Sequence, residues 1–231
     1  MNLNILSGGA AQGLVKTLAA PFKARTGFDI AGEFGAVGAM ADKLRKGAAA
    51  DIIILTAALV AKLADEKLVI SSSTTDVGLV ETAIAVRVRD SKIAAGNADD
   101  LRRALLASDA IYVPDTKTAT AGIHVAKMLT QLGIADAVAT RLKVYPNGAT
   151  AMRELASSTA KHPIGCTQST EIISTEGVQL SGALPKGCEL ATMYTAGITT
   201  SAASPHQAQI LIELLTKTES RELRGRAGFV G

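Results

Sequence analysis

The sequence contains no tryptophan, and aromatic residues make up only 3% of its 231 residues. A chain with so few aromatic rings has no cluster on which nucleic-acid bases or sugar rings would stack. Segments with charges of a single sign are also absent, because the 24 Lys and Arg residues are interspersed with 21 Asp and Glu residues. The resulting net charge of +3 gives no support for nucleic-acid binding, and we expect no nucleic-acid partner.

Long hydrophobic runs are absent as well. No apolar stretch approaches the roughly 18 residues of a membrane-spanning helix, so we expect no membrane insertion. The first residues, Met1–Leu6, lack the basic start, apolar stretch and small-residue cleavage site of a secretory signal. We therefore expect a periplasmic location if a native leader was removed, and otherwise a cytoplasmic one.

Cysteine and histidine are rare, with two and three residues respectively. Cys166 and Cys188 do not have a metal-ligand spacing, and they could be free thiols or one disulfide, with free thiols favoured. We expect neither a metal nor a cofactor. A Gly-x-Ser-x-Gly nucleophile motif and a complete dinucleotide-binding glycine motif are both missing, which argues against a serine hydrolase and a dinucleotide enzyme.

What the sequence does contain is aliphatic residues punctuated by Gly and Pro, which predict alternating strands and helices. Such alternation is typical of an α/β fold with mainly parallel sheets, and the chain is long enough to bury a substantial core. The long strands 79–88 and 190–199 bracket the middle of the chain and predict two lobes, with a ligand cleft between them. Lobe 1 is expected over 1–82 and 198–231, and lobe 2 over 83–197. The other expected strands are 3–6, 28–34, 51–55, 110–113, 141–145 and 164–167, and the expected helices are 11–26, 39–46, 59–65, 101–106, 122–132, 149–158, 205–216 and 219–226.

Several segments together resemble the type II periplasmic-binding-protein fold, in its molybdate-binding-protein-like branch of solute-binding proteins. The resemblance runs nearly end to end and implies two lobes, each a mainly parallel sheet flanked by helices. It also implies capture of a small anion by hinge closure, without covalent chemistry, by a monomer that would deliver its ligand to an ABC transporter permease. The segments that carry it are 22–28, 47–52, 118–122, 164–165 and 211–229.

Small and hydroxyl residues recur just after apolar strands, and ligands of open parallel sheets bind at the carboxyl ends of strands. Thr56, directly after Ile52–Leu55, shows this arrangement most clearly. Helix starts at such positions also offer free backbone N–H groups to an anion. The residues expected to contact the ligand are Ser7, Gly8, Gly9, Ala10, Ala36, Val37, Gly38, Thr56, Thr82, Thr118, Thr120, Ala121, Asn147, Gly148, Ala149, Thr167, Gln168 and Ser169.

Some of these residues also have ordinary structural explanations. Helix capping alone would account for one hydroxyl of Thr118 and Thr120. Asn147 with Gly148 would also form a tight turn, and the polar run 167–170 would serve equally as a surface turn.

The resemblance implies a ligand other than molybdate. Molybdate binders of this branch usually present Ser hydroxyls from the first two strand–helix loops and a Tyr after the 164–165 equivalent. Here Ala10 stands at the first Ser position, the second loop (35–38) has no hydroxyl, and Gln168 replaces the Tyr. We therefore expect an organic carboxylate as the ligand.

A second relation on the same scaffold, with the aconitate isomerases, implies an alternative: isomerisation of an unsaturated carboxylic acid. Such a reaction needs a positioned acid or base. The candidates are His124, in the first turn of a predicted helix, and Glu81, which would be a base if buried in its strand. The structural alternatives are a partly exposed histidine and a hydrogen-bonded carboxylate. A ligand-sensing domain of the cytoplasm is a third hypothesis.

Overall fold

The computed structural model describes residues 1–230. These residues form two compact units, of which unit 1 comprises Met1–Val80 and the chain from Thr192 onward, and unit 2 comprises Glu81–Ala191. The chain passes from one unit to the other within strand β4 (Thr75–Arg87) and at the beginning of β9 (Ala191–Ile198).

Unit 1 is built around three parallel strands in the order β2-β1-β3, and β9 joins β3 antiparallel. The register places Gly8 beside Gly35 and Ser7 beside Ile54. The carboxyl ends of these parallel strands therefore meet at one edge, where the chain turns into helices. The strands are β1 (Asn2–Gly8), β2 (Asp29–Gly35) and β3 (Ile52–Thr56), and β10 (Phe229–Val230) pairs antiparallel with β4.

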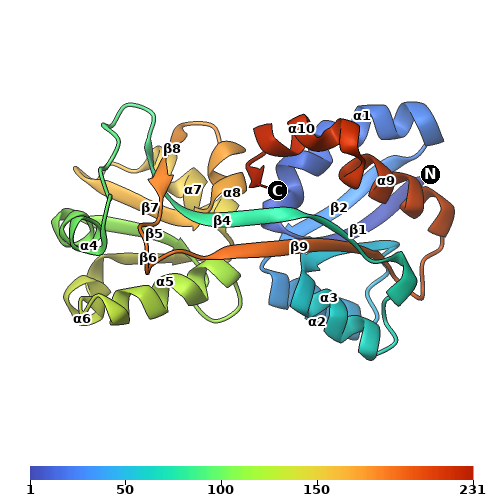
Figure 1. Ribbon diagram of the computed structural model, residues 1–231, viewed down its shortest axis with the longest axis horizontal. Helices are drawn as coiled ribbons and strands as arrows, with labels where there is room; N and C mark the ends of the chain where they lie inside the picture. The colour runs from blue at the N-terminus through green and yellow to red at the C-terminus, as the bar shows by residue number, and fades with distance from the viewer. Residues whose placement is uncertain (231) are drawn as a thin grey trace. The chain divides into compact units, whose positions relative to one another are not determined.

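Helices cover both faces of this sheet, with α2 and α3 on one side and α1 and α9 on the other (Figure 1). Apolar residues at helical spacing explain the packing of α1, because Leu14, Leu18 and Phe22 are all buried against the strands. The helices of unit 1 are α1 (Gln12–Thr26), α2 (Val37–Arg45), α3 (Ala57–Asp65), α9 (Pro205–Thr216) and α10 (Arg221–Arg226), with short turns η1 (Gly9–Ala11), η2 (Ser71–Ser73) and η4 (Thr218–Ser220).

Unit 2 repeats this plan with the parallel order β6-β5-β7, and β4 pairs antiparallel with both β7 and β8. Helix α5 lies on one side of its sheet and α7 and α8 on the other (Figure 1). Its elements are β5 (Ala110–Pro114), β6 (Leu142–Tyr145), β7 (Pro163–Gln168), β8 (Val178–Ala183), α4 (Ala98–Ala107), α5 (Thr120–Gln131), α6 (Ala135–Val138), η3 (Ala139–Arg141), α7 (Gly148–Ser157) and α8 (Ser169–Ile173).

The α/β fold confirms the expectation, and most predicted elements appear with shifted ends. β4 is longer than predicted because it starts at Thr75, and α6, α8 and β8 were not predicted at all. Helix α8 follows β7 directly, and its first residues are polar. A polar run of this kind is also typical of a turn, which is why the sequence did not predict a helix here. Both cysteines are free and buried, as favoured from the sequence.

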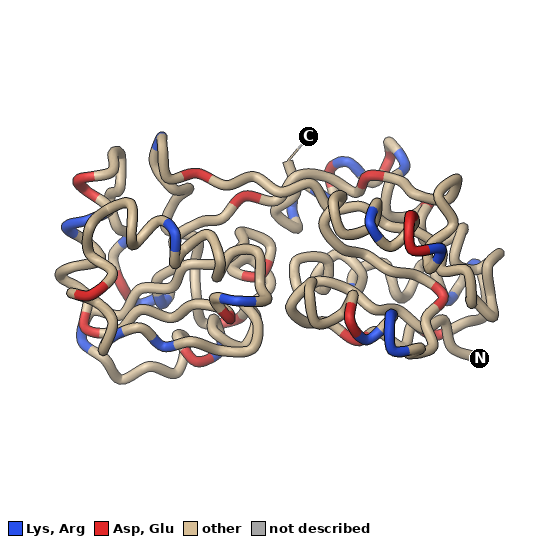
Figure 2. Tube along the Cα trace, turned by 90° about the horizontal axis from the view of Figure 1, so that it is seen from below, with Lys and Arg blue, Asp and Glu red and all other residues tan. Residues whose placement is uncertain are grey.

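Charged side chains of both signs are interspersed over each unit, as Figure 2 shows. Within residues 1–230, no helix combines the length and the apolar character needed to cross a membrane. The anion site expected from the sequence must therefore use local groups rather than a field of one sign.

Candidate functional site

The first strand–helix loop at the carboxyl edge of unit 1 offers backbone amides rather than a free hydroxyl. Ser7 is fully buried and its hydroxyl donates to the Gly8 carbonyl oxygen at 2.9 Å. The chain then enters η1, where Gly9 and Ala10 are buried and no side chain caps the turn. The one hydroxyl of this loop is thus committed to the backbone.

Helices α2 and α3 begin at the same edge with no side-chain cap. Ala36 precedes α2, whose first turn contains Val37 and Gly38, and Thr56 precedes α3. The first N–H groups of a helix have no partner within the helix. At these starts they receive no capping oxygen from Ala36 or Thr56, so they are available to an anion.

Tyr194 fills the space beside Gly8. A Cβ atom on residue 8 would lie 2.9 Å from Tyr194 Cε1 and 2.8 Å from Val37 Cγ1. The Tyr194 side chain is almost completely buried. The lack of a side chain at Gly8 therefore admits a tyrosine ring instead of leaving open space at this edge.

Unit 2 has a different arrangement, because a buried carboxylate lies at its helix start. Thr167, near the end of β7, donates its hydroxyl to Glu171 Oε2 at 2.6 Å. Glu171 also interacts with the backbone N–H groups of Ala149, Gln168 and Gly148. Burial raises the pKa of the Glu171 carboxyl, whereas the Thr167 hydroxyl and these N–H groups act in the opposite direction.

The first turn of α7 is consequently occupied from within the protein. Asn147 is its N-cap and accepts a hydrogen bond from the Thr150 N–H at 2.8 Å. A Cβ atom on residue 148 would lie only 1.9 Å from Glu171 Oε2 and 2.1 Å from Thr167 Oγ1. Gly148 is thus required by the close approach of the Glu171 carboxylate.

The start of α5 is shaped by Asp115, which accepts the Thr118 hydroxyl at 2.8 Å and the N–H groups of Lys117 and Thr118. The Lys117 N–H and the Thr118 hydroxyl hold the pKa of the Asp115 carboxyl below its usual value. Thr118 is therefore committed to this turn. Thr120 and Ala121 lie in the first turn of α5, and the N-cap residue Ala119 supplies no side-chain bond.

The end of β7 gathers the remaining polar candidates of unit 2. Gln168 and Ser169 are buried there, and Thr82 of β4 is the register partner of Gln168. The neighbouring Thr170, which was not among the predicted ligand residues, is 2% exposed, and its hydroxyl has no hydrogen-bond partner within residues 1–230. Local polar groups are therefore concentrated at this strand end.

The two candidate acids or bases have different settings. Glu81 is exposed, so the burial on which its role as a base depended is absent. His124 is half-buried and donates from Nε2 to the Cys188 carbonyl oxygen at 2.7 Å, which fixes its tautomer. Burial raises the pKa of the Cys166 thiol to about 12, consistent with an inert core residue. No cluster of three or more metal-ligating side chains exists among residues 1–230.

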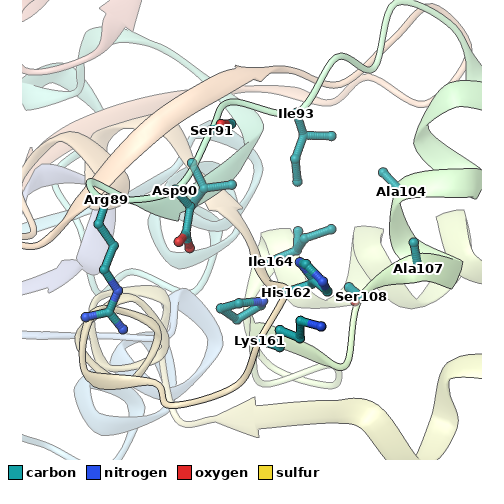
Figure 3. Close-up of a pocket in the computed structure, with 12 residues that line it drawn as sticks. Arg89, Asp90, Ser91, Ile93, Ala104, Ala107, Ser108, Lys161, His162 and Ile164 are labelled. Carbon is teal, nitrogen blue, oxygen red and sulfur yellow. The ribbon is translucent and has the colours of Figure 1, made fainter.

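A separate cavity of about 570 Å³ in unit 2 contains none of the predicted residues. Ile93, Ala104, Ala107 and Ile164 form its apolar wall, and the His162 ring lies beside Ile164 (Figure 3). The Arg89 guanidinium points away from this wall in the same view. Pro163 begins β7, so the cavity adjoins the opposite end of that strand from Gln168.

Comparison with known proteins identifies the family. The family model for bacterial extracellular solute-binding proteins matches residues 3–230. The chain belongs to this family. The solute-binding fold is also that of the periplasmic molybdate-binding protein of Azotobacter vinelandii, with a TM-score of 0.82, 18% identity and 99% of each chain covered.

Two further relatives differ in the functions that their names give. The sulfate-binding protein SubI of Mycobacterium tuberculosis H37Rv has a TM-score of 0.76 and 16% identity, over 99% of this chain and 86% of SubI. Aconitate isomerase of a Pseudomonas species is 22% identical over an alignment of 229 positions, which covers 94% of this chain and 83% of the isomerase. This solute-binding protein therefore resembles both binders of small anions and an enzyme.

Sequence reasoning missed Glu171 and Tyr194 as parts of these edges. Glu171 is an acidic residue within the polar run that follows β7. It would have been predicted as part of this edge if the sequence had indicated that α8 is a helix. Tyr194 carried a weaker signal, because an aromatic residue in a strand usually belongs to the core. Its position beside Gly8 depends on the pairing of β9 with β3, which the sequence does not specify.

Proposed function

We propose that this solute-binding protein captures a small anion, an organic carboxylate rather than molybdate, with the carboxyl edges of its two units. Binding involves closure of the units on the ligand and no covalent chemistry. We further propose a location outside the cytoplasm and delivery to an ABC transporter. Family membership supports this general role.

The observation that carries the ligand assignment is the lack of a free hydroxyl in the first two strand–helix loops of unit 1, residues 7–10 and 35–38. Ala10 and Val37 stand at the two helix starts, and the Ser7 hydroxyl is already bonded to the Gly8 carbonyl. Such an edge can offer N–H groups and apolar contacts. A carboxylate with an attached carbon skeleton matches that combination better than a fully polar tetrahedral oxyanion.

A thermal-shift screen tests the proposal with molybdate, tungstate, sulfate, citrate, cis-aconitate and trans-aconitate. A ligand that binds only the folded state raises the melting temperature by mass action. We expect citrate or an aconitate isomer to give the largest increase. The largest increase with molybdate or tungstate would contradict the ligand assignment, and no increase with any anion would contradict anion capture.

An isomerase of unsaturated carboxylic acids is the second candidate. Two observations favour it: the similarity to aconitate isomerase and the buried Glu171 carboxylate, whose raised pKa suits proton transfer. Proton NMR of cis-aconitate incubated with the protein separates the two candidates. Conversion to the trans isomer would make this chain an enzyme, whereas stabilisation without conversion favours capture alone.

A further inference from the structure

Glu171 places a buried carboxyl group of the protein at the start of α7, one of the helix starts at which we propose that the ligand binds. Its side chain starts from the first turn of α8 and reaches the first turn of α7, which packs against α8. The carboxylate lies so close to α7 that a single methyl group on Gly148 would meet Oε2 at 1.9 Å. Its residue is only 5% exposed.

Within residues 1–230, no charged side chain is among the groups that act on this carboxyl group. The elements that pack most extensively against α8 are α7, β7 and β8. Their ionisable side chains are Cys166 on β7 and the exposed Arg153 and Glu154 on α7, and β8 has none. The groups that act on Glu171 are the Thr167 hydroxyl and backbone N–H groups, while burial favours the neutral form.

The same groups belong to the edge at which we propose ligand binding. Gln168 and Ala149 are candidate ligand contacts, and their N–H groups interact with Glu171. An external anion at this edge would therefore lie near a second negative charge in a site with little water. Two like charges in such surroundings disfavour joint ionisation, and one of them takes up a proton.

We infer that Glu171 is a specificity-determining residue of unit 2, through which each bound anion is accompanied by one proton. This inference rests on the proposed function, because it concerns the same edge. The proton comes from solvent and forms an O–H bond on the Glu171 carboxyl group, and no other bond forms or breaks. Neutral Glu171 leaves a single negative charge at the edge, that of the ligand, so monoanionic carboxylate groups are favoured over dianionic oxyanions.

Isothermal titration calorimetry in pairs of buffers with different ionisation enthalpies measures this proton directly. The probes are trans-aconitate and sulfate, which both keep a constant charge from about pH 6.5 to about pH 8.5. We expect the wild-type affinity for trans-aconitate to fall by up to about tenfold per pH unit, with uptake of up to about one proton per anion. E171Q should bind both anions with a pH-independent affinity and take up no proton.

Matched variants keep the test specific. E154Q removes an exposed carboxylate of α7 and should behave like the wild type. T167V removes the hydroxyl that favours the ionised form of Glu171, so proton uptake should extend to higher pH. This variant supplies the test if E171Q does not fold, as judged by circular dichroism.

The outcomes separate the two proposals. Anion binding with no proton uptake, or uptake that persists in E171Q or is unmoved in T167V, overturns the inference and leaves anion capture intact. No binding of any anion between these pH values, by a folded protein, overturns the proposed function itself.

Discussion

The two units present the same kind of edge but fill it in opposite ways. In unit 1 the helix starts at Ala10 and Val37 have no capping side chain, and the space beside Gly8 is filled by an aromatic ring. In unit 2 the start of α7 is capped by Asn147 and faces the buried Glu171 carboxylate. The helix starts of unit 1 are thus uncapped by side chains, whereas the start of α7 in unit 2 already faces a carboxyl group of the protein.

The largest effect should come from a methyl group at the crowded edge of unit 2. We expect Gly148→Ala to destabilise the fold by about 3 kcal/mol, because its Cβ would overlap buried polar atoms. Chemical denaturation measures the loss. Gly182→Ala is the matched control, since a Cβ there meets nothing within 4 Å, and equal losses for the two variants would contradict the described crowding.

A methyl group at the edge of unit 1 should cost less. Gly8→Ala would place Cβ 2.8 Å from Val37 Cγ1 and 2.9 Å from Tyr194 Cε1, a milder overlap than the 1.9 Å at residue 148, and we expect a loss of about 1–2 kcal/mol. The double variant with Val37→Ala should recover part of that loss in the same denaturation assay. A double variant with fully additive losses would show that Val37 is not the obstacle.

The pH dependence of stability distinguishes the units next. Because burial raises the pKa of Glu171, its contribution is fully present below the unfolded carboxyl pKa of about 4.3 and is lost as the pH rises through the folded value. E171Q should therefore become more stable relative to the wild type as the pH increases. Melting curves across the pH range measure this, and a constant difference between the two proteins would contradict it.

The smallest effects are expected when single side chains are removed, one from each unit, and the affinity for the ligand is compared. Gln168→Ala should weaken binding of the best carboxylate about tenfold, as expected for one lost hydrogen bond to a charged group. Ser7→Ala should leave the affinity within about twofold, because its hydroxyl is bonded to the Gly8 carbonyl. Calorimetric titration compares them, and a larger loss for Ser7→Ala would reverse the assignment of the two side chains.

The sequence was sufficient for the fold and for the places where helices begin at strand ends. Gly27 ends a helix because of its local backbone conformation, and the apolar run Ile52–Leu55 forms a strand because it is buried. A sequence pattern shows both features directly. The candidate ligand positions followed from the strand ends and the family resemblance, and they remain predictions.

What the sequence could not supply was the pairing of side chains across elements. Glu171 reaches α7 from α8, and Tyr194 reaches Gly8 from β9, so each contact depends on tertiary packing. The same limitation left the burial of Glu81 open, because alternation along a strand does not say which side faces solvent when both faces are partly covered.

The central claim is tested most directly by calorimetric titration of the wild-type protein with citrate and with molybdate at the same pH. The lack of a free hydroxyl in the first two strand–helix loops of unit 1 predicts at least about tenfold tighter binding of citrate, a difference of about 1.4 kcal/mol. Tighter binding of molybdate would contradict the account, because it would show that backbone amides alone recognise a tetrahedral oxyanion here.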